Sequence, residues 1–111
     1  MTDLSRKRCA PCTGDTPRVA PDEVTRLLLG LPGYKADLLV GSISKTYEFK
    51  DFYETMAFVN AVAWIANQQD HHPDLTVGYG KAGVLFATHS VGGLSENDFI
   101  CAAKVNALGS L

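Results

Sequence analysis

Residues 51–70 read DFYETMAFVNAVAWIANQQD, and their apolar side chains recur with a helical period. One apolar row repeats at spacings of four, three, four and three residues, and it comprises Phe52, Met56, Val59, Ala63 and Ala66. A second row comprises Phe58, Val62 and Ile65. The pattern predicts a long helix whose apolar surface is wider than a single stripe. Such a helix must bury more than one side, so we expect one side to cover a sheet and another to meet a second copy of the chain in a homo-oligomer.

Short apolar runs on both sides of this helix predict two hairpins. Before it, residues 38–40 and 43–49 are parted by Gly41-Ser42, and the second run has the β-branched and aromatic content typical of a strand. After it, residues 75–79 alternate in polarity, and an apolar run over 84–88 follows a glycine-containing turn sequence. Two runs that are joined by a tight turn favour antiparallel strands.

Helices are also predicted near both ends of the chain. Pro21-Asp22-Glu23 has the proline and the acids of a first helical turn, and this helix should stop between Gly30 and Gly33. Ser95-Glu96-Asn97-Asp98 is a capping-box pattern that opens a last helix. The order helix, two strands, helix, two strands, helix predicts an α+β fold of two layers, with three helices packed on one face of a four-stranded antiparallel sheet. We expect residues 1–20 to be a flexible N-terminal arm and residues 21–111 to be a single domain.

Composition argues against several functional classes. The formal net charge of −2 at pH 7 gives no field that would collect nucleic acid or acidic lipid. No window approaches 18 consecutive apolar residues and the start of the chain is charged, so neither a membrane span nor a secretory peptide is indicated, and we expect a cytoplasmic protein. The three cysteines form no disulfide framework, which fits a reducing compartment.

Cys9 and Cys12 form a Cys-x-x-Cys pair close to the start of the chain. The pair could be half of a zinc site, but a structural zinc needs four ligands and no second pair stands at a suitable spacing. A thioredoxin-like redox pair would follow a strand and begin a helix, whereas prolines and a glycine surround this one. We therefore interpret the segment as a loosely ordered tail.

The three histidines of the chain all lie within residues 71–89, from the end of the long helix to the end of the last strand. Histidine has an ordinary pKa of about 6.5, so His71, His72 and His89 could give and take protons near neutral pH. Each could instead be a simple helix-end or strand-end residue. A three-histidine zinc site is a further alternative, although neighbours such as His71 and His72 seldom point at one metal. Asp98 likewise has a structural explanation, since its carboxylate can cap the last helix.

A series of motifs extends over nearly the whole sequence: Cys9-x-x-Cys12, Leu31-Pro32-Gly33-Tyr34, Tyr47-x-Phe49-Lys50-Asp51-Phe52, Ala57-Phe58-Val59-Asn60, Asp70-His71-His72-Pro73-Asp74, Tyr79, Thr88-His89, Gly92-Gly93-Leu94-Ser95 and Asp98. Together these motifs resemble those of the pterin-4a-carbinolamine dehydratase family in its bacterial form. This resemblance implies a small α+β subunit that forms a homodimer or homotetramer and uses no metal or organic cofactor. Two positions depart from the family pattern: Asn67 stands where a Glu is usual, and Leu75 stands where many members have an aromatic residue.

The resemblance implies a lyase that dehydrates 4a-hydroxytetrahydropterin to quinonoid dihydropterin, in tetrahydropterin recycling for aromatic amino-acid hydroxylation. It marks His71, His72 and His89 as catalytic residues. It marks Asp98, Pro73 and Tyr79 as residues that bind or orient the substrate. The reaction needs a proton on the leaving hydroxyl and removal of the N5 proton, which two histidines can provide. The same resemblance includes dehydratase-like binding or assembly modules, of the Rubisco assembly factor or transcription-factor dimerisation cofactor type, so binding of a protein partner is the alternative function.

Overall fold

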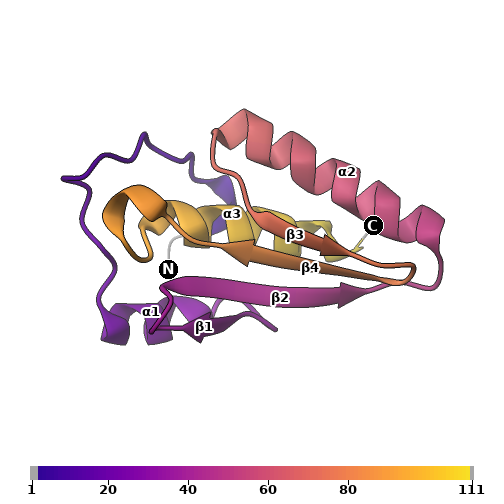
Figure 1. Cartoon of the computed structure of the whole chain (residues 1–111), viewed down its shortest axis with the longest axis horizontal. Coiled ribbons are helices and arrows are strands. Elements are labelled where there is room, and N and C mark those ends of the chain that lie inside the picture. The colour runs from indigo at the N-terminus through magenta and orange to yellow at the C-terminus, as the bar shows by residue number, and fades with distance from the viewer. Residues whose placement is uncertain (1–2, 111) are drawn as a thin grey trace.

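The computed structural model describes residues 3–110, which form a sheet covered by helices (Figure 1). Within these residues the sheet has four strands, β1 (Lys35–Asp37), β2 (Ser42–Glu48), β3 (Asp74–Val77) and β4 (Lys81–Phe86). Their spatial order is β1-β2-β4-β3, and each neighbouring pair is antiparallel. The central strands β2 and β4 pair from Ile43 opposite Phe86 to Glu48 opposite Lys81.

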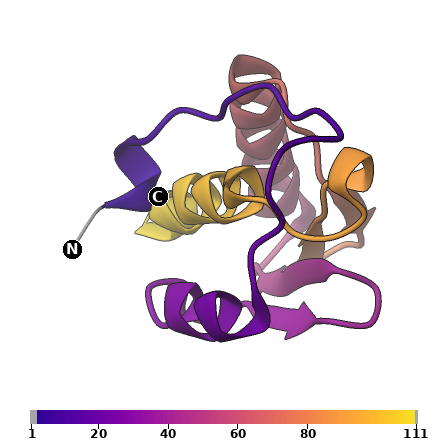
Figure 2. The ribbon, with the colours of Figure 1, turned by 90° about the vertical axis from the view of Figure 1, so that its left-hand side faces the viewer.

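Three helices of the described chain lie on one face of this sheet, α1 (Pro21–Leu28), α2 (Phe52–Gln69) and α3 (Glu96–Asn106) (Figure 2). Short 3-10 turns also occur, η1 (Leu4–Arg6), η2 (His89–Val91) and η3 (Ala107–Ser110). The core fills the space between the two layers, and alternate residues of β4 contribute Ala82, Val84 and Phe86 to it. This is the two-layer α+β architecture that the sequence predicts. Within residues 3–110, none of the helices combines the length and the apolar character that a bilayer span requires.

Two aspartates, Asp51 and Asp70, flank the long helix α2 as its cap residues. The side chain of Asp51 caps its first turn by accepting a hydrogen bond from the backbone N–H of Glu54 at 2.9 Å. The row of residues that faces the core comprises Thr55, Phe58, Val62, Ile65 and Ala66. Much of the other predicted row is not fully covered, and Phe52 keeps 48% of its surface exposed. One apolar side of α2 therefore packs on the sheet, as predicted, and a second side is left at the surface of the subunit.

The first hairpin differs from its prediction in position. β1 covers residues 35–37, whereas the apolar run 38–40 forms the connecting turn and is exposed. Oδ1 of Asp37 accepts hydrogen bonds from the backbone N–H groups of Leu39 and Val40 in this turn, at 3.0 and 3.1 Å. Gly41 then takes a φ of 79°, which favours glycine. Local capping by an aspartate has thus outweighed the strand propensity of the run.

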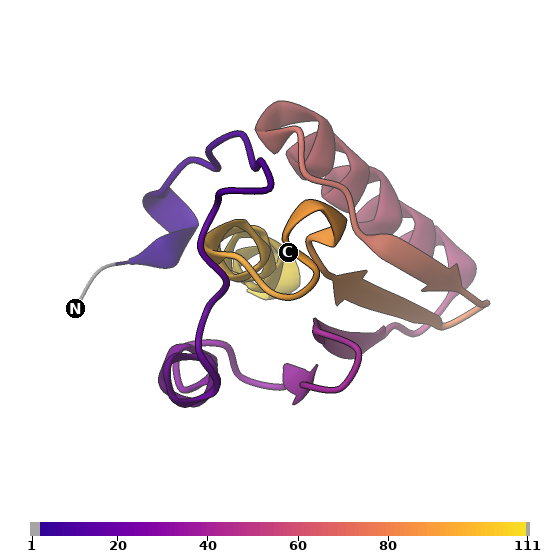
Figure 3. The same ribbon diagram turned by 60° about the vertical axis from the view of Figure 1, so that its left-hand side comes forward.

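The N-terminal arm lies across α3 and reaches the end of α2 (Figure 3). Its backbone is held by side chains of the domain: the N–H of Cys9 donates to Oε1 of Gln69 at 2.8 Å. Ala10 exchanges two hydrogen bonds with the amide of Asn97, at 3.0 and 2.6 Å. These contacts give the arm a defined course along the domain, while its flexibility stays a prediction.

Candidate active site

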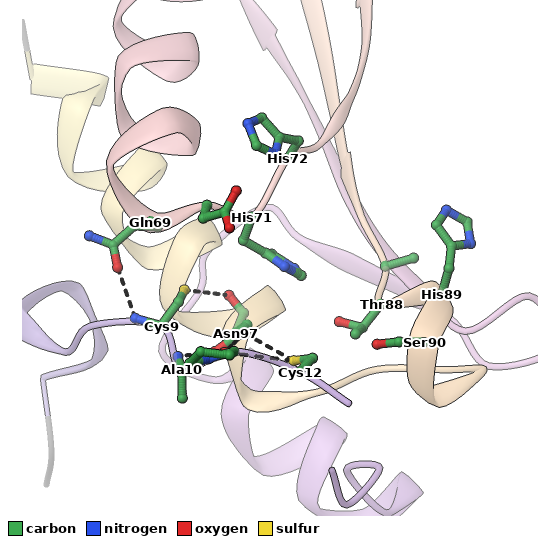
Figure 4. A pocket seen from close by; sticks show the side chains of 13 residues that line it. Cys9, Ala10, Cys12, Gln69, His71, His72, Thr88, His89, Ser90 and Asn97 are labelled. Carbon is green, nitrogen blue, oxygen red and sulfur yellow. Dashed lines mark hydrogen bonds between the residues drawn. The ribbon is translucent and has the colours of Figure 1, made fainter. Parts of the chain in front are cut away.

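The candidate site begins where α2 ends. Asp70 adopts a φ of 51°, in the left-handed region, and this residue stops the helix and redirects the chain. The backbone N–H of His71 still reaches back to the carbonyl of Ala66 at 3.1 Å, which fixes His71 under the helix end. His72 precedes Pro73, and the proline ring favours an extended backbone at the residue before it. The two adjacent imidazoles therefore point in different directions (Figure 4).

His71 is paired with a buried carboxylate. Its Nε2 lies 2.6 Å from Oδ1 of Asp98, and the Asp98 side chain has no exposed surface. The other carboxylate oxygen accepts hydrogen bonds from the hydroxyl of Thr88 at 2.7 Å and from the backbone N–H of Ser95 at 2.9 Å. Burial lowers the pKa of His71, but the hydrogen bond and the charge of Asp98, together with the charges of Cys9 and Asp70, raise it by more, so its pKa lies above the ordinary value of 6.5. Asp98 thus caps α3 and contacts a histidine ring at the same time.

A series of polar side chains connects this pair to the N-terminal arm. Oγ of Ser95 lies 2.7 Å from Oγ1 of Thr88, and because Thr88 donates its proton to Asp98, Ser95 is the donor to Thr88. The thiol of Cys12 donates to Oγ of Ser95 at 3.6 Å. The sulfur of Cys12 also accepts from Nδ2 of Asn97 at 3.0 Å. Hydrogen bonds therefore run without a break from the arm to the buried carboxylate.

His72 and His89 are exposed, and Figure 4 shows their rings standing apart from His71. Nε2 of His72 lies 3.1 Å from Oδ1 of Asn67, so an uncharged amide is its partner in this structure. His89 opens η2, beyond the end of β4 at Phe86, instead of ending a strand as the sequence predicts. The chain already turns there, because the N–H of Thr88 bonds to the carbonyl of Gly93 at 3.0 Å.

All three histidines line one cavity of about 510 Å³. The arm forms part of the opposite wall with residues 9–12, and Gln69 lines it at the end of α2. The structure therefore brings His89 to the same cavity as the adjacent His71 and His72. Among the side chains of residues 3–108, no three or more His, Cys, Asp or Glu are grouped as a metal ion would require.

Three residues of the predicted site, Asp98, Pro73 and Tyr79, do not line this cavity. Asp98 is buried behind His71. Tyr79 is in the turn between β3 and β4, where its ring stacks on Phe52 with centroids 6.4 Å apart and its carbonyl accepts a hydrogen bond from the hydroxyl of Thr55. Pro73 stands next to His72 and acts on the backbone direction there. The arm, in contrast, is a contributor that sequence reasoning missed, because its prolines and its lack of period indicate only a tail.

The fold and the histidine cavity together can be compared with known proteins. The family model for Pterin 4 alpha carbinolamine dehydratase matches residues 17–108. A protein of Nitrosospira multiformis named "Putative pterin-4-alpha-carbinolamine dehydratase" is 54% identical over 108 residues, which is 97% of this chain and 94% of that protein. The chain therefore belongs to the pterin 4 alpha carbinolamine dehydratase family.

Two solved structures resemble this one. A crystal structure of a transcriptional coactivator/pterin dehydratase from Brucella melitensis has a TM-score of 0.80 and 32% sequence identity, and the match covers 84% of this chain and 99% of that one. A pterin dehydratase-like protein identified as a RuBisCO assembly factor in the alpha-carboxysome has a TM-score of 0.56 and 22% identity, over 68% of this chain and 86% of that one. The second likeness concerns the fold alone.

Proposed function

We propose that the chain is a dehydratase that converts 4a-hydroxytetrahydropterin to quinonoid dihydropterin and water. The observation that carries this proposal is the contact of His71 with buried Asp98, because His71 lines the same cavity as His72 and His89. Imidazoles around one volume can supply both an acid and a base near neutral pH. Membership of the pterin 4 alpha carbinolamine dehydratase family supports the same reaction.

The reaction is an elimination with two proton transfers. One proton goes to the 4a-hydroxyl, which leaves as water with the electron pair of the C4a–O bond. The other proton leaves N5, and the electron pair of that N–H bond becomes the second bond between C4a and N5. We assign these transfers to His72 and His89, because both rings are exposed at the cavity. One ring gains a proton and the other loses one in each turnover, and exchange with water restores both.

His71 has a different part in this mechanism. When Asp98 is ionised, the proton on Nε2 of His71 is directed at its carboxylate, which leaves Nδ1 for the pterin or for a proton relay. The raised pKa favours a protonated ring, which can donate a hydrogen bond to a pterin oxygen or nitrogen. Asp98 acts through His71 as a positioning residue. The biological setting that we propose is tetrahydropterin recycling for aromatic amino-acid hydroxylation.

We further propose that the subunit forms a homodimer or homotetramer. Large apolar side chains remain exposed on the outer side of α2, where Tyr53 has 89% and Trp64 65% of its surface exposed. The edge strand β3 is exposed along its length and carries Leu75 and Val77. Contact with another copy would remove this apolar surface from water and give the outer edge of β3 a partner.

The alternative function is that of a binding or assembly module. The contact of His72 with Asn67 favours the binding or assembly module. The Glu that is usual in the family at position 67 would place a negative charge beside His72, whereas the amide of Asn67 is neutral. A relative of the same fold is described as a RuBisCO assembly factor. One chain could also carry both functions, dehydration of the pterin and binding of a protein partner.

An assay of dehydration distinguishes the two functions. The purified full-length chain is added to freshly prepared 4a-hydroxytetrahydropterin, and formation of quinonoid dihydropterin is followed by absorbance at a pH where the spontaneous reaction is slow. A rate that rises in proportion to protein concentration supports the dehydratase. A rate equal to that in buffer, together with tight binding of a protein partner, supports the assembly module.

A further inference from the structure

Two cysteines that are remote in the sequence meet beside the candidate site. Sγ of Cys9, in the N-terminal arm, lies 3.4 Å from Sγ of Cys101, in α3. Cys101 has no exposed surface, whereas Cys9 is partly exposed and lines the histidine cavity. The proposed dehydration uses neither sulfur.

The hydrogen bonds around the two thiols define which one donates its proton to the other. The thiol of Cys9 donates to the backbone carbonyl of Asn97 at 3.7 Å, which leaves its sulfur to accept the proton of Cys101. This hydrogen bond from Cys101 lowers the pKa of Cys9, burial opposes it, and the nearby His71 lowers the pKa further. The same contact and burial raise the pKa of Cys101. Cys9 is thus the accessible thiol with the more stable thiolate, and Cys101 is the enclosed partner.

We propose that Cys9 and Cys101 are a redox-active thiol pair, which a small-molecule disulfide oxidises to an intramolecular disulfide. The Cys9 thiolate attacks one sulfur of the oxidant, and the first oxidant thiol leaves. The sulfur of Cys101 then attacks Sγ of Cys9, and the proton of Cys101 passes to the second oxidant thiolate as it leaves. Two protein thiols are oxidised and one external disulfide is reduced to two thiols, so atoms and electrons balance.

The surroundings favour this pairing over one between Cys9 and Cys12. A disulfide has an S–S distance of about 2.05 Å, so the sulfurs of Cys9 and Cys101 must approach by roughly 1.4 Å. The arm at Cys9 has no regular helix or strand to resist that movement. The sulfur of Cys12, in contrast, is engaged with Asn97 and Ser95 on another part of the wall.

The bond would join the arm covalently to α3 next to His71. Cys9 and Cys101 are 92 residues apart, and a cross-link that closes a long loop restricts the unfolded chain more than the folded one. Oxidised protein should therefore unfold at a higher temperature than reduced protein. The position of residues 9–12 in the cavity wall would be fixed by the same bond.

The test uses the full-length chain, reduced and then treated with glutathione disulfide. Acid stops the exchange, the remaining free thiols are then alkylated, and the peptides are mapped by mass spectrometry. We expect a cross-link between Cys9 and Cys101, with Cys12 alkylated, after a transient glutathione adduct on Cys9. Cys12→Ser should form the same cross-link. Cys101→Ala should stop at the glutathione adduct on Cys9.

Other results would overturn the proposal. A cross-link between Cys9 and Cys12 in the wild-type chain would do so, as would an unmodified Cys9 when glutathione disulfide is in excess. If Cys101→Ala does not fold, as judged by circular dichroism, the mapping of the wild type and of Cys12→Ser still decides the question. None of these measurements depends on dehydratase activity.

Discussion

Nε2 of His71 and Oδ1 of Asp98 lie 2.6 Å apart, although 27 residues separate them in the sequence. The contact joins the end of α2 to the first turn of α3, so it couples the position of one histidine to the packing of two helices. Because the Asp98 side chain is fully buried, its interactions cannot be replaced by water when they are lost.

Asp98→Asn should destabilise the protein. The carboxylate uses both oxygens as acceptors, for His71 on one side and for Thr88 and Ser95 on the other, whereas an amide has one oxygen. The charge-assisted contact between a protonated His71 and the carboxylate is lost, at a cost of about 1–3 kcal/mol in the free energy of unfolding. Urea denaturation followed by circular dichroism measures this loss.

Glu96→Gln is the matched control for that experiment. Glu96 is in the same first turn of α3, but its ion pair with Lys7 is exposed. Exposed pairs contribute about 0–1 kcal/mol, so the control should remain close to wild type. Equal unfolding free energies for Asp98→Asn and the wild type would contradict the role of the buried carboxylate.

The pKa of His71 predicts how stability changes with pH. Because its folded-state pKa is raised above 6.5, protonation of the ring favours the folded protein. This contribution is complete below the unfolded-state pKa, near pH 6.5, and is lost as the pH rises through the folded-state pKa. The difference in unfolding free energy between the wild type and His71→Gln should therefore shrink across that window. A difference that grows with pH would mean that Asp98 does not raise the pKa of His71.

Light scattering at micromolar concentration should give the mass of a dimer or tetramer. If the outer side of α2 is the contact, Trp64→Lys should lower the average mass, because a charge would enter an apolar interface. Thr25→Lys is the control, since Thr25 is exposed on α1, away from α2 and β3. If Val77→Lys lowers the mass instead, the contact is at β3. A monodisperse wild-type monomer would contradict the oligomer.

Local patterns in the sequence predict most of the fold. The helical period of residues 51–70 and the capping box at Ser95 are properties of neighbouring residues, and the corresponding helices are confirmed. The sequence predicts the first strand over 38–40 because this run has strand-like side chains, whereas in the structure the strand covers residues 35–37 and Asp37 caps a turn. Side-chain capping of this kind competes with propensity at short range and is hard to weigh from composition.

The site could be predicted only in part, because its contacts join distant segments. The three histidines stand out by residue type, and the resemblance to a family marks Asp98. The hydrogen bond between His71 and Asp98 depends on how α2 and α3 pack, and the place of Cys9 depends on the path of the arm over α3. Nothing in the spacing of these residues indicates that path.

The turnover numbers of wild type, His72→Ala and His89→Ala on 4a-hydroxytetrahydropterin, corrected for the spontaneous rate, test the dehydratase mechanism most directly. If both rings transfer protons in the rate-limiting step, each substitution should lower kcat by roughly a hundredfold or more, with a smaller change in substrate binding. Gln68→Ala, an exposed change on α2 away from the cavity wall, should keep the wild-type rate. Wild-type rates in both histidine variants would contradict the account.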